Sequence, residues 1–322
     1  MFLLALLVSA AASWWLARYI SAPIYGLQKS ARILARGDLN AKVEERFSRR
    51  LDEIGTLARD FNHMAGELKA QIEAKEILLR DISHELRSPL GRIQMALGLA
   101  ALDSANVQTQ HRRIERDIER MSALIEEIIR LARLTDAPQS FPMEDGVDLG
   151  LLLDEIAEDA SPEAAVYGRR IVVMCPSNLL LRGNPELLRR AIENIMRNAI
   201  RYSPDGTEID VTARREGHVA VIDVRDRGPG VPKAELGRIF DPFYRVSRAR
   251  EREGGGTGLG LAITARVVSL HAGQVSASNH AGGGLVVTMS LPANVACRTE
   301  IVPLVESMGG PPGAASAFDL PS

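Results

Sequence analysis

The chain opens with an uninterrupted apolar stretch. Residues 1–17 contain no charged side chain, Trp14 and Trp15 stand near the end of the stretch, and Arg18 follows it. This length reaches the lower limit for a helix that crosses a bilayer, and aromatic and basic residues typically mark the cytoplasmic end. We therefore predict a transmembrane helix over residues 1–20, followed by cytoplasmic domains. A cleaved signal peptide is the alternative, but no basic residues precede the apolar part.

Two short helical patterns joined by a polar connector follow in residues 21–74. Pro23 stands where a helix can begin, residues 37–38 interrupt the first pattern, and the acidic residues 52–53 favour the N-terminus of a second helix. Apolar positions recur at spacings of three and four, at Ile24, Leu27, Ala31, Leu34, Ile54, Leu57, Phe61, Met64 and Leu68. Two such helices cannot bury their apolar stripes alone, so we expect a parallel homodimer.

The pattern of residues 75–135 predicts a helical hairpin with a break at residues 103–106. Its two apolar seams are formed by Leu86, Leu90, Ile93, Leu97 and Ala100, and by Ile114, Ile118, Met121, Ile125 and Ile128. Two hairpins from a dimer would bury both seams in a four-helix bundle. Pro89 removes a backbone donor inside the first helix, so we expect a bend that exposes the flank of His84.

The pattern of hydrophobic and polar positions changes after a predicted linker at residues 136–148, which is rich in proline, serine and acidic residues. Residues 149–292 read as a mixed α/β domain, and the tail, 293–322, is rich in glycine, proline, alanine and serine and is predicted to be disordered. Strands are predicted at 171–174, 208–213, 219–224, 274–278 and 285–291. Helices are predicted at 185–201, where Asn184 caps the first turn, and at 257–270.

The amino-acid composition excludes only a few classes of function. A formal net charge of −2 gives no general attraction to nucleic acid, and the 4% aromatic content argues against base stacking, so no nucleic-acid partner is expected. Cys175 and Cys297 lie far apart without metal-ligand spacing, so neither a disulfide framework nor a zinc site is predicted.

One histidine on the predicted hairpin stands beside a carboxylate. Neutral imidazole can attack through one ring nitrogen while a neighbouring base, here Glu85 beside His84, takes the proton from the other. By itself the pair is more often two solvated residues on a helix. Its chemical role depends on the rest of the chain.

The helix at 185–201 carries two amides one turn apart. Asn194 and Asn198 share a face, so their oxygen atoms can hold a hydrated Mg²⁺ and its phosphates. Arg201 and Tyr202 follow within a turn and can contact phosphate. Two asparagines on a surface helix are the simpler interpretation of this cluster taken alone.

A short motif, Asp226-Arg227-Gly228-Pro229-Gly230, ends a predicted strand. A carboxylate such as that of Asp226 can accept a hydrogen bond from the exocyclic amine of adenine, and Gly228 and Gly230 permit a tight turn beside the base. In isolation such a motif is commonly only a turn.

A glycine-rich loop leads into the last predicted helix. Successive backbone N–H groups at a helix N-terminus form an anion cradle. The loop lacks the lysine of a Walker A motif and the register of a dinucleotide fold. The segment from Ile239 to Arg252 is predicted to be a mobile lid, with Phe240 and Arg245 among its contact residues. The cradle consists of Gly256, Thr257, Gly258, Leu259 and Gly260.

Together, these clusters resemble the H, N, G1, F and G2 boxes of sensor histidine kinases, over about residues 15–292. The motif Asp52-Glu53-Ile54-Gly55 resembles the acidic motif of a HAMP relay domain, and the HAMP-linked envelope-stress sensors of the Cpx type are the most similar subgroup. The resemblance implies a multidomain fold. Its parts are a transmembrane helix, an α-helical HAMP domain, a dimerising helical hairpin and an α/β sandwich of the gyrase, Hsp90 and MutL superfamily.

The resemblance also implies a function at the bacterial inner membrane, in contact with its lipid. ATP with Mg²⁺ would phosphorylate His84, Glu85 would accept or orient the proton, and the phosphoryl group would pass to an aspartate of a response regulator. The family uses the side chain four residues after the histidine to position water for dephosphorylation of the regulator. Here it is Ser88, where threonine or asparagine is more usual, so phosphatase activity is a secondary expectation.

Two alternatives stay open. The first is an ATP-hydrolysing clamp protein of the same nucleotide fold; those proteins resemble one another in a water-activating glutamate at the position of Asn194, and Glu193 is rotated by about 100° from it. The second is a non-enzymatic, membrane-anchored dimer scaffold, against which the intact glycines, both asparagines and Asp226 argue.

Overall fold

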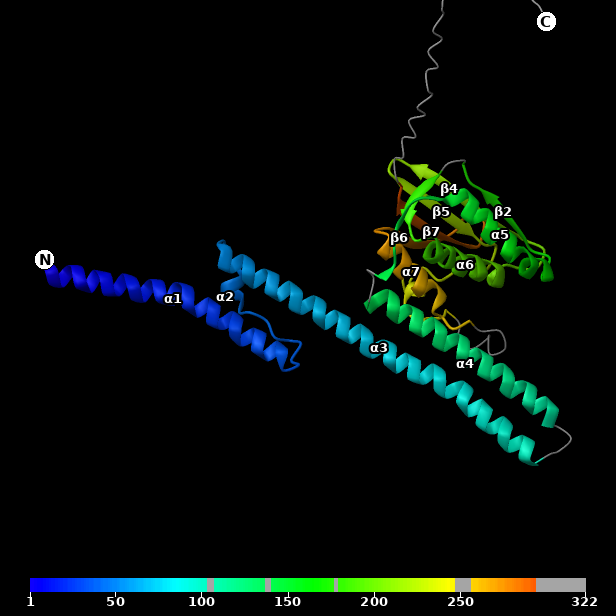
Figure 1. Ribbon diagram of the computed structural model, residues 1–322, viewed down its shortest axis with the longest axis horizontal. Helices are drawn as coiled ribbons and strands as arrows, with labels where there is room; N and C mark the ends of the chain where they lie inside the picture. The colour runs from blue at the N-terminus through cyan, green and yellow to red at the C-terminus, as the bar shows by residue number, and fades with distance from the viewer. Residues whose placement is uncertain (103–106, 137–139, 177–178, 247–255, 294–322) are drawn as a thin grey trace, which may run out of the picture. The chain divides into compact units, whose positions relative to one another are not determined.

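A computed structural model describes residues 1–102, 107–136, 140–176, 179–246 and 256–293 (Figure 1). The chain divides into two compact units, Met1–Ile129 and Arg130–Ser322, which are described separately. The break predicted in the hairpin at residues 103–106 and most of the predicted tail lie outside the described residues. Ala293, assigned to the disordered tail, instead pairs with Leu181 in an isolated bridge and donates its N–H to the carbonyl of His218 at 2.7 Å.

The first unit is helical. It contains α1 (Phe2–Ala35), α2 (Glu45–Ser48), α3 (Glu53–Leu102) and most of α4 (Val107–Asp136) (Figure 1). α1 is long and apolar enough to cross a membrane, and its apolar part is not buried. The short α2 lies inside the segment predicted as a polar connector, because Phe47 turns inward onto a small core.

Pro23 does not begin a new helix as predicted, because α1 runs through it without a break. Proline cannot donate to the carbonyl four residues earlier, which leaves the oxygen of Tyr19 without its helical partner. The guanidinium of Arg50 fills this gap, since its Nη1 donates to that oxygen at 3.1 Å. A side chain distant in sequence therefore compensates for the proline.

The core of the relay segment consists of Val43, Phe47 and Ala58, against which Leu27 and Phe61 pack. α3 begins at a side-chain cap that the acidic motif supplies. Asp52 accepts the N–H of Gly55 at 3.1 Å, and a Cβ on Gly55 would lie 2.1 Å from the carbonyl oxygen of Arg50, so only glycine fits there.

Apolar seam positions of the hairpin stay exposed in a single chain. Leu90, Leu97, Ile118 and Ile125 are 42–56% exposed. Partial burial of this kind is expected of a helical pair that needs a second copy, and it supports the predicted homodimer. α3 continues through Pro89, which is buried, and the bend there stays a prediction.

The second unit is an α/β sandwich. Its five-stranded sheet has the order β2-β4-β5-β7-β6, in which β2 and β4 are parallel and the other pairs are antiparallel. The five predicted strands are thereby confirmed. Their bounds are β2 (Arg170–Met174), β4 (Glu208–Glu216), β5 (Val219–Arg225), β6 (Gln274–Asn279) and β7 (Leu285–Pro292).

Helices α5 (Leu149–Val166), α6 (Pro185–Tyr202) and α7 (Gly260–Leu270) form the second layer (Figure 1). β4 alternates buried and partly buried residues, as expected of a strand with one face in the core. Fully buried side chains of the sheet and of α6 form that core, among them Ile209, Ile222, Met289, Leu188, Ile192 and Met196. The helix predicted at 185–201 is confirmed, including its cap, because Asn184 Oδ1 accepts the N–H of Leu187 at 2.9 Å.

Several elements of the second unit were not predicted. β1 (Glu144–Asp148) lies within the predicted linker and pairs antiparallel with β3 (Leu180–Gly183) in a separate two-stranded sheet, so the linker assignment is wrong for these five residues. The strand has no clear alternation in sequence because none of its residues is fully buried. α5 follows it directly, since Asp148 accepts the N–H groups of Gly150 and Leu151.

The last turns of α4 pack within the second unit. Leu131 is 6% exposed and Leu134 is fully buried. Arg266 on α7 donates from Nε to the carbonyl of Leu134 at 3.1 Å and from Nη2 to that of Thr135 at 3.3 Å. These bonds satisfy carbonyl groups that the end of a helix leaves without partners.

Candidate nucleotide-binding and phosphoacceptor sites

The candidate nucleophile lies on the exposed surface of α3. His84 and Glu85 are both solvent-exposed, and Ser88 is exposed one turn further on. Consecutive helix positions differ by about 100°, so Glu85 flanks the histidine rather than covering it. The arrangement leaves the imidazole accessible to a bulky substrate, which is what a phosphoacceptor needs.

Ser88 is held by an ion pair that crosses the hairpin. Its Oγ accepts a hydrogen bond from Arg92 Nη1 at 3.0 Å. Arg92 forms a bidentate pair with Asp117 on α4, with Nη2 to Oδ1 at 2.8 Å and Nε to Oδ2 at 3.2 Å. The Asp117 side chain is only 10% exposed, so the pair is fixed at its carboxylate end. The hydroxyl of Ser88 therefore has a defined position, which the sequence did not reveal.

The two asparagines of α6 have different surroundings. Asn194 Nδ2 donates to the carbonyl of Gly260 at 3.1 Å, which ties α6 to the first residue of α7 and leaves its Oδ1 as the atom able to reach a metal. Asn198 lies one turn later and is half-buried. Two amide oxygens suit Mg²⁺, which usually takes few protein ligands and completes its shell with phosphate and water. Among the described residues no cluster of three or more histidine, cysteine or acidic side chains offers an alternative metal site.

Asp226 lies at the end of β5 and is 6% exposed. Its Oδ1 accepts the N–H of Gly228 at 2.8 Å and that of Leu285 at 2.9 Å. Burial raises the pKa of this carboxyl above its usual value, and the two backbone hydrogen bonds and Arg225 oppose the shift. Both hydrogen bonds fall on Oδ1, so within the part of the chain that the structure describes Oδ2 is left for an outside donor.

The glycines of the second motif are required by close contacts. A Cβ on Gly228 would lie 2.6 Å from the carbonyl oxygen of Tyr202. Gly230 has φ +72°, and a Cβ there would lie 2.6 Å from Asn279 Oδ1. Asn279 also accepts the N–H of Val231 at 2.9 Å, so it holds this turn in place. Asn279 was not among the predicted site residues, although an asparagine at a strand end before a turn is a recognisable signal.

The glycine-rich loop contacts both α6 and the segment after η3 (Arg238–Phe240). A Cβ on Gly256 would lie 2.6 Å from Arg201 Nη1. Gly258 has φ +75°, and its carbonyl accepts the N–H of Phe243 at 2.9 Å. Phe243 itself has φ +61°, a strained value for a bulky residue. The predicted helix at 257–270 therefore begins only at Gly260, because residues 256–259 form a loop that packs against Arg201 and Phe243.

Parts of the predicted lid fall within the described residues. Phe240 and Arg245 are half-buried, and residues 247–255 lie outside the description. Tyr244 packs under the guanidinium of Arg238, 4.3 Å from its ring centroid. Burial and a hydrogen bond to Glu235 raise the pKa of the Tyr244 hydroxyl. The mobility of the lid stays a prediction.

The C-terminal half of α6 gathers the predicted nucleotide motifs. Asn194 contacts Gly260, Arg201 contacts Gly256, and the backbone of Tyr202 contacts Gly228. Thr257 and Leu259 lie in the same loop, where Thr257 Oγ1 accepts the N–H of Leu259 at 3.3 Å. Three sequence clusters that span some 65 residues are thus neighbours in one domain.

Three family matches cover the same parts of the chain. Residues 15–70 match the HAMP domain, and residues 74–137 match the His Kinase A (phospho-acceptor) domain. Residues 183–295 match the histidine kinase-, DNA gyrase B-, and HSP90-like ATPase family. This order of domains defines the sensor histidine kinases of two-component systems, and the chain belongs to that family.

Individual relatives agree with this class. The sensor histidine kinase CpxA of Escherichia coli strain K12 is 35% identical over 289 residues, which cover 89% of this chain and 62% of CpxA. BaeS, a signal transduction histidine-protein kinase of the same strain, is 31% identical over 308 residues, 92% of this chain and 63% of its own length. The chain thus spans less than two thirds of these relatives. The histidine kinase AdeS of Acinetobacter baumannii shares the fold with a TM-score of 0.53 and 19% identity, over 66% of this chain and 98% of AdeS.

Proposed function

We propose that this chain phosphorylates His84 with ATP and passes the phosphoryl group to an aspartate of a response regulator. The convergence of Asn194, Arg201 and Tyr202 on the loops that contain Gly260, Gly256 and Gly228 carries the proposal. It supports a single pocket with a metal-binding face, an adenine-binding turn and a phosphate cradle.

Each part has a distinct task. Asp226 Oδ2 accepts a hydrogen bond from the adenine amine, and the backbone N–H groups of residues 256–260 bind the phosphates. Asn194 and Asn198 hold Mg²⁺, which neutralises the phosphate charge. Positioning and electrostatics of this kind supply most of the catalysis in phosphoryl transfer.

At His84 the chemistry is a substitution at phosphorus. A ring nitrogen forms a bond to the γ-phosphorus while the bond from that phosphorus to the β–γ bridging oxygen breaks, and ADP leaves with the electron pair. Glu85 accepts or orients the proton of the other ring nitrogen. The phosphoryl group then moves to a carboxylate oxygen of the regulator, which restores the neutral imidazole.

The structure offers no support for the water-activating alternative. The position expected to carry a catalytic glutamate is Asn194, whose amide is occupied with Gly260. The neighbouring Glu193 faces Arg189, one turn earlier, at 4.0 Å. Transfer to His84 is therefore favoured over hydrolysis by a clamp protein.

Ser88 supports a second activity, dephosphorylation of the regulator. Because Arg92 donates to its oxygen, the hydroxyl proton is free to bind a water molecule or a phosphoryl oxygen. We further propose that the protein acts as a homodimer in the bacterial inner membrane, with residues 1–20 of α1 in the lipid and the catalytic domains in the cytoplasm. We also propose the domain bounds 1–20, 21–74 and 75–135. The catalytic domain, predicted at 149–292, extends to include β1 and Ala293, because both pair with β3.

Labelling with γ-³²P-ATP tests the kinase proposal. The wild-type chain should acquire acid-labile, alkali-stable label, and His84→Gln should abolish it. His111→Gln is the matched control, since His111 is also an exposed hairpin histidine beside a glutamate, with Nδ1 3.3 Å from Glu115 Oε1. Asn198→Asp should prevent labelling without unfolding the domain. Persistent label of this type in His84→Gln would contradict the assignment.

A further inference from the structure

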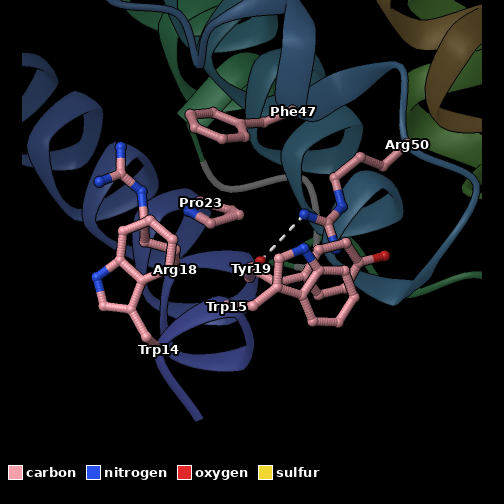
Figure 2. A pocket seen from close by; sticks show the side chains of 7 residues that line it. All are labelled: Trp14, Trp15, Arg18, Tyr19, Pro23, Phe47 and Arg50. Atoms are coloured by element: carbon pink, nitrogen blue, oxygen red, sulfur yellow. Dashed lines mark hydrogen bonds between the residues drawn. The ribbon is translucent and has the colours of Figure 1, made fainter. Parts of the chain in front are cut away.

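A pocket of about 340 Å³ lies in the helical unit, where α1 meets the segment before α3. Figure 2 shows Arg18 and Trp14 on one side of Pro23 and Arg50 on the other. Its lining is Trp14, Trp15, Arg18, Tyr19, Pro23, Phe47 and Arg50. None of these residues belongs to the nucleotide site or to the phosphoacceptor.

The two arginines of the pocket differ in charge balance. Arg50 is neutralised by Asp52, to which its Nε donates at 3.0 Å, and this ion pair with its hydrogen bonds lowers the pKa of Asp52 to about 2. Its guanidinium also covers the ring of Tyr19 at 3.9 Å. Arg18 lies over the ring of Trp14 at 5.3 Å and has no acidic partner among the described residues. The pocket therefore carries one uncompensated positive charge.

The position of Arg18 along α1 indicates which part of the membrane its guanidinium contacts. The apolar stretch of α1 carries no charged side chain, and Arg18 directly follows it. If α1 spans the bilayer as proposed above, Arg18 reaches the level of the lipid headgroups. Trp14 and Trp15 are 65% and 60% exposed, so both indoles face the surroundings of the helix. Indole N–H groups typically lie at this depth.

We infer that the pocket binds the phosphate-bearing headgroup of an anionic phospholipid. Arg18 would pair with the phosphate, and the indole N–H groups of Trp14 and Trp15 are further donors. Arg50 and Phe47 form the opposite wall, and they belong to the segment that leads into α3. A bound headgroup would therefore contact both α1 and the segment that positions the start of α3, which makes the packing of this segment dependent on lipid composition.

The intrinsic fluorescence of the full chain provides the test, because Trp14 and Trp15 are its only tryptophans and both line the pocket. The chain is reconstituted in phosphatidylcholine vesicles that contain equal fractions of either brominated phosphatidylglycerol or brominated phosphatidylcholine. One basic residue near a membrane surface enriches anionic lipid about fivefold. Brominated phosphatidylglycerol should therefore quench the tryptophans at a severalfold lower lipid fraction.

Arg18→Gln should remove this preference and Arg18→Lys should restore most of it. Arg36→Gln is the control, since Arg36 is an exposed basic residue after α1 that does not line the pocket. Equal quenching by the two lipids, or a preference that survives in Arg18→Gln, would overturn the inference, as would a lack of quenching by both. An emission change on adding glycerol phosphate to plain phosphatidylcholine vesicles would assign the site to soluble phosphate instead. Labelling of His84 in the same vesicles reports separately on the kinase proposal.

Discussion

Asp226→Asn separates the nucleotide role of this residue from its structural role. Asparagine keeps an Oδ1 that can accept the N–H groups of Gly228 and Leu285, which lie 2.8 and 2.9 Å from Asp226 Oδ1 in the wild type. It replaces the outward oxygen by an NH₂ group, which is a donor facing the donor amine of adenine. A hydrogen bond to a charged group contributes about 1.5–3 kcal/mol, so ATP should bind roughly 10- to 150-fold more weakly.

The fold should tolerate the change. Burial raises the pKa of Asp226, because the folded state disfavours the charged carboxylate. The free energy of unfolding therefore decreases as the pH rises from 3.8, the usual pKa, to the raised pKa of the folded state. Asparagine carries no such cost. The free energy of unfolding at neutral pH should therefore change by less than about 1 kcal/mol, or increase slightly.

Calorimetric titration with a non-hydrolysable ATP analogue measures the loss of affinity in Asp226→Asn. A second analogue that lacks the 6-amino group of adenine completes a double-mutant cycle. Removal of the amine should weaken binding to the wild type but not to Asp226→Asn. The reasoning fails if Asp226→Asn binds ATP like the wild type. It also fails if amine removal costs the same in both proteins, because the carboxylate then does not contact the amine.

Three further predictions concern stability. Burial lowers the pKa of His271 below 6.5, and its Nε2 accepts the backbone N–H at the cap of α6; stability should therefore fall as the pH drops below 6.5, and thermal melts of His271→Gln should lack this decline. Gly258→Ala should cost about 1–3 kcal/mol in urea unfolding and weaken ATP binding, because φ is +75° and the Cβ would lie 2.9 Å from Phe243 Cα; unchanged melting would contradict this. Asp117→Ala should lower the free energy of unfolding by about 1–3 kcal/mol, which is less than the loss of a fully buried ion pair costs, because the partner Arg92 is half exposed. Glu67→Ala is the control: Glu67 faces His63 in an exposed pair, so the same melts should show a loss of under about 1 kcal/mol.

The regular parts of the fold could be predicted because their signals are local. The cap at Asn184 and the strands of the five-stranded sheet follow from periodicity and helix-end chemistry. β1 could not be predicted, because its five residues are incompletely buried and its partner, β3, lies more than 30 residues away. The continuity of α1 through Pro23 depends on Arg50, 27 residues later, which no local pattern reveals.

The candidate site likewise has features that local sequence predicts and features that depend on contacts between distant residues. Asp226, Asn194 and the glycines could be selected as candidate site residues from motif and spacing. Their mutual contacts could not, since the bond from Asn194 to Gly260 joins residues 66 positions apart. The positioning of Ser88 by Arg92 and Asp117 also depends on how two helices pair, and neither partner carries a sequence signal of its own.

The packing of the last turns of α4 affects how the ATP-binding domain can be isolated. A fragment that begins at residue 149 would remove Leu131 and Leu134 and uncover the apolar surface that they bury. It would also leave Arg266 without the two carbonyl oxygens that it binds. A soluble, nucleotide-binding fragment should therefore begin no later than Arg130, although the residues that it gains belong to the helix of the phosphoacceptor hairpin.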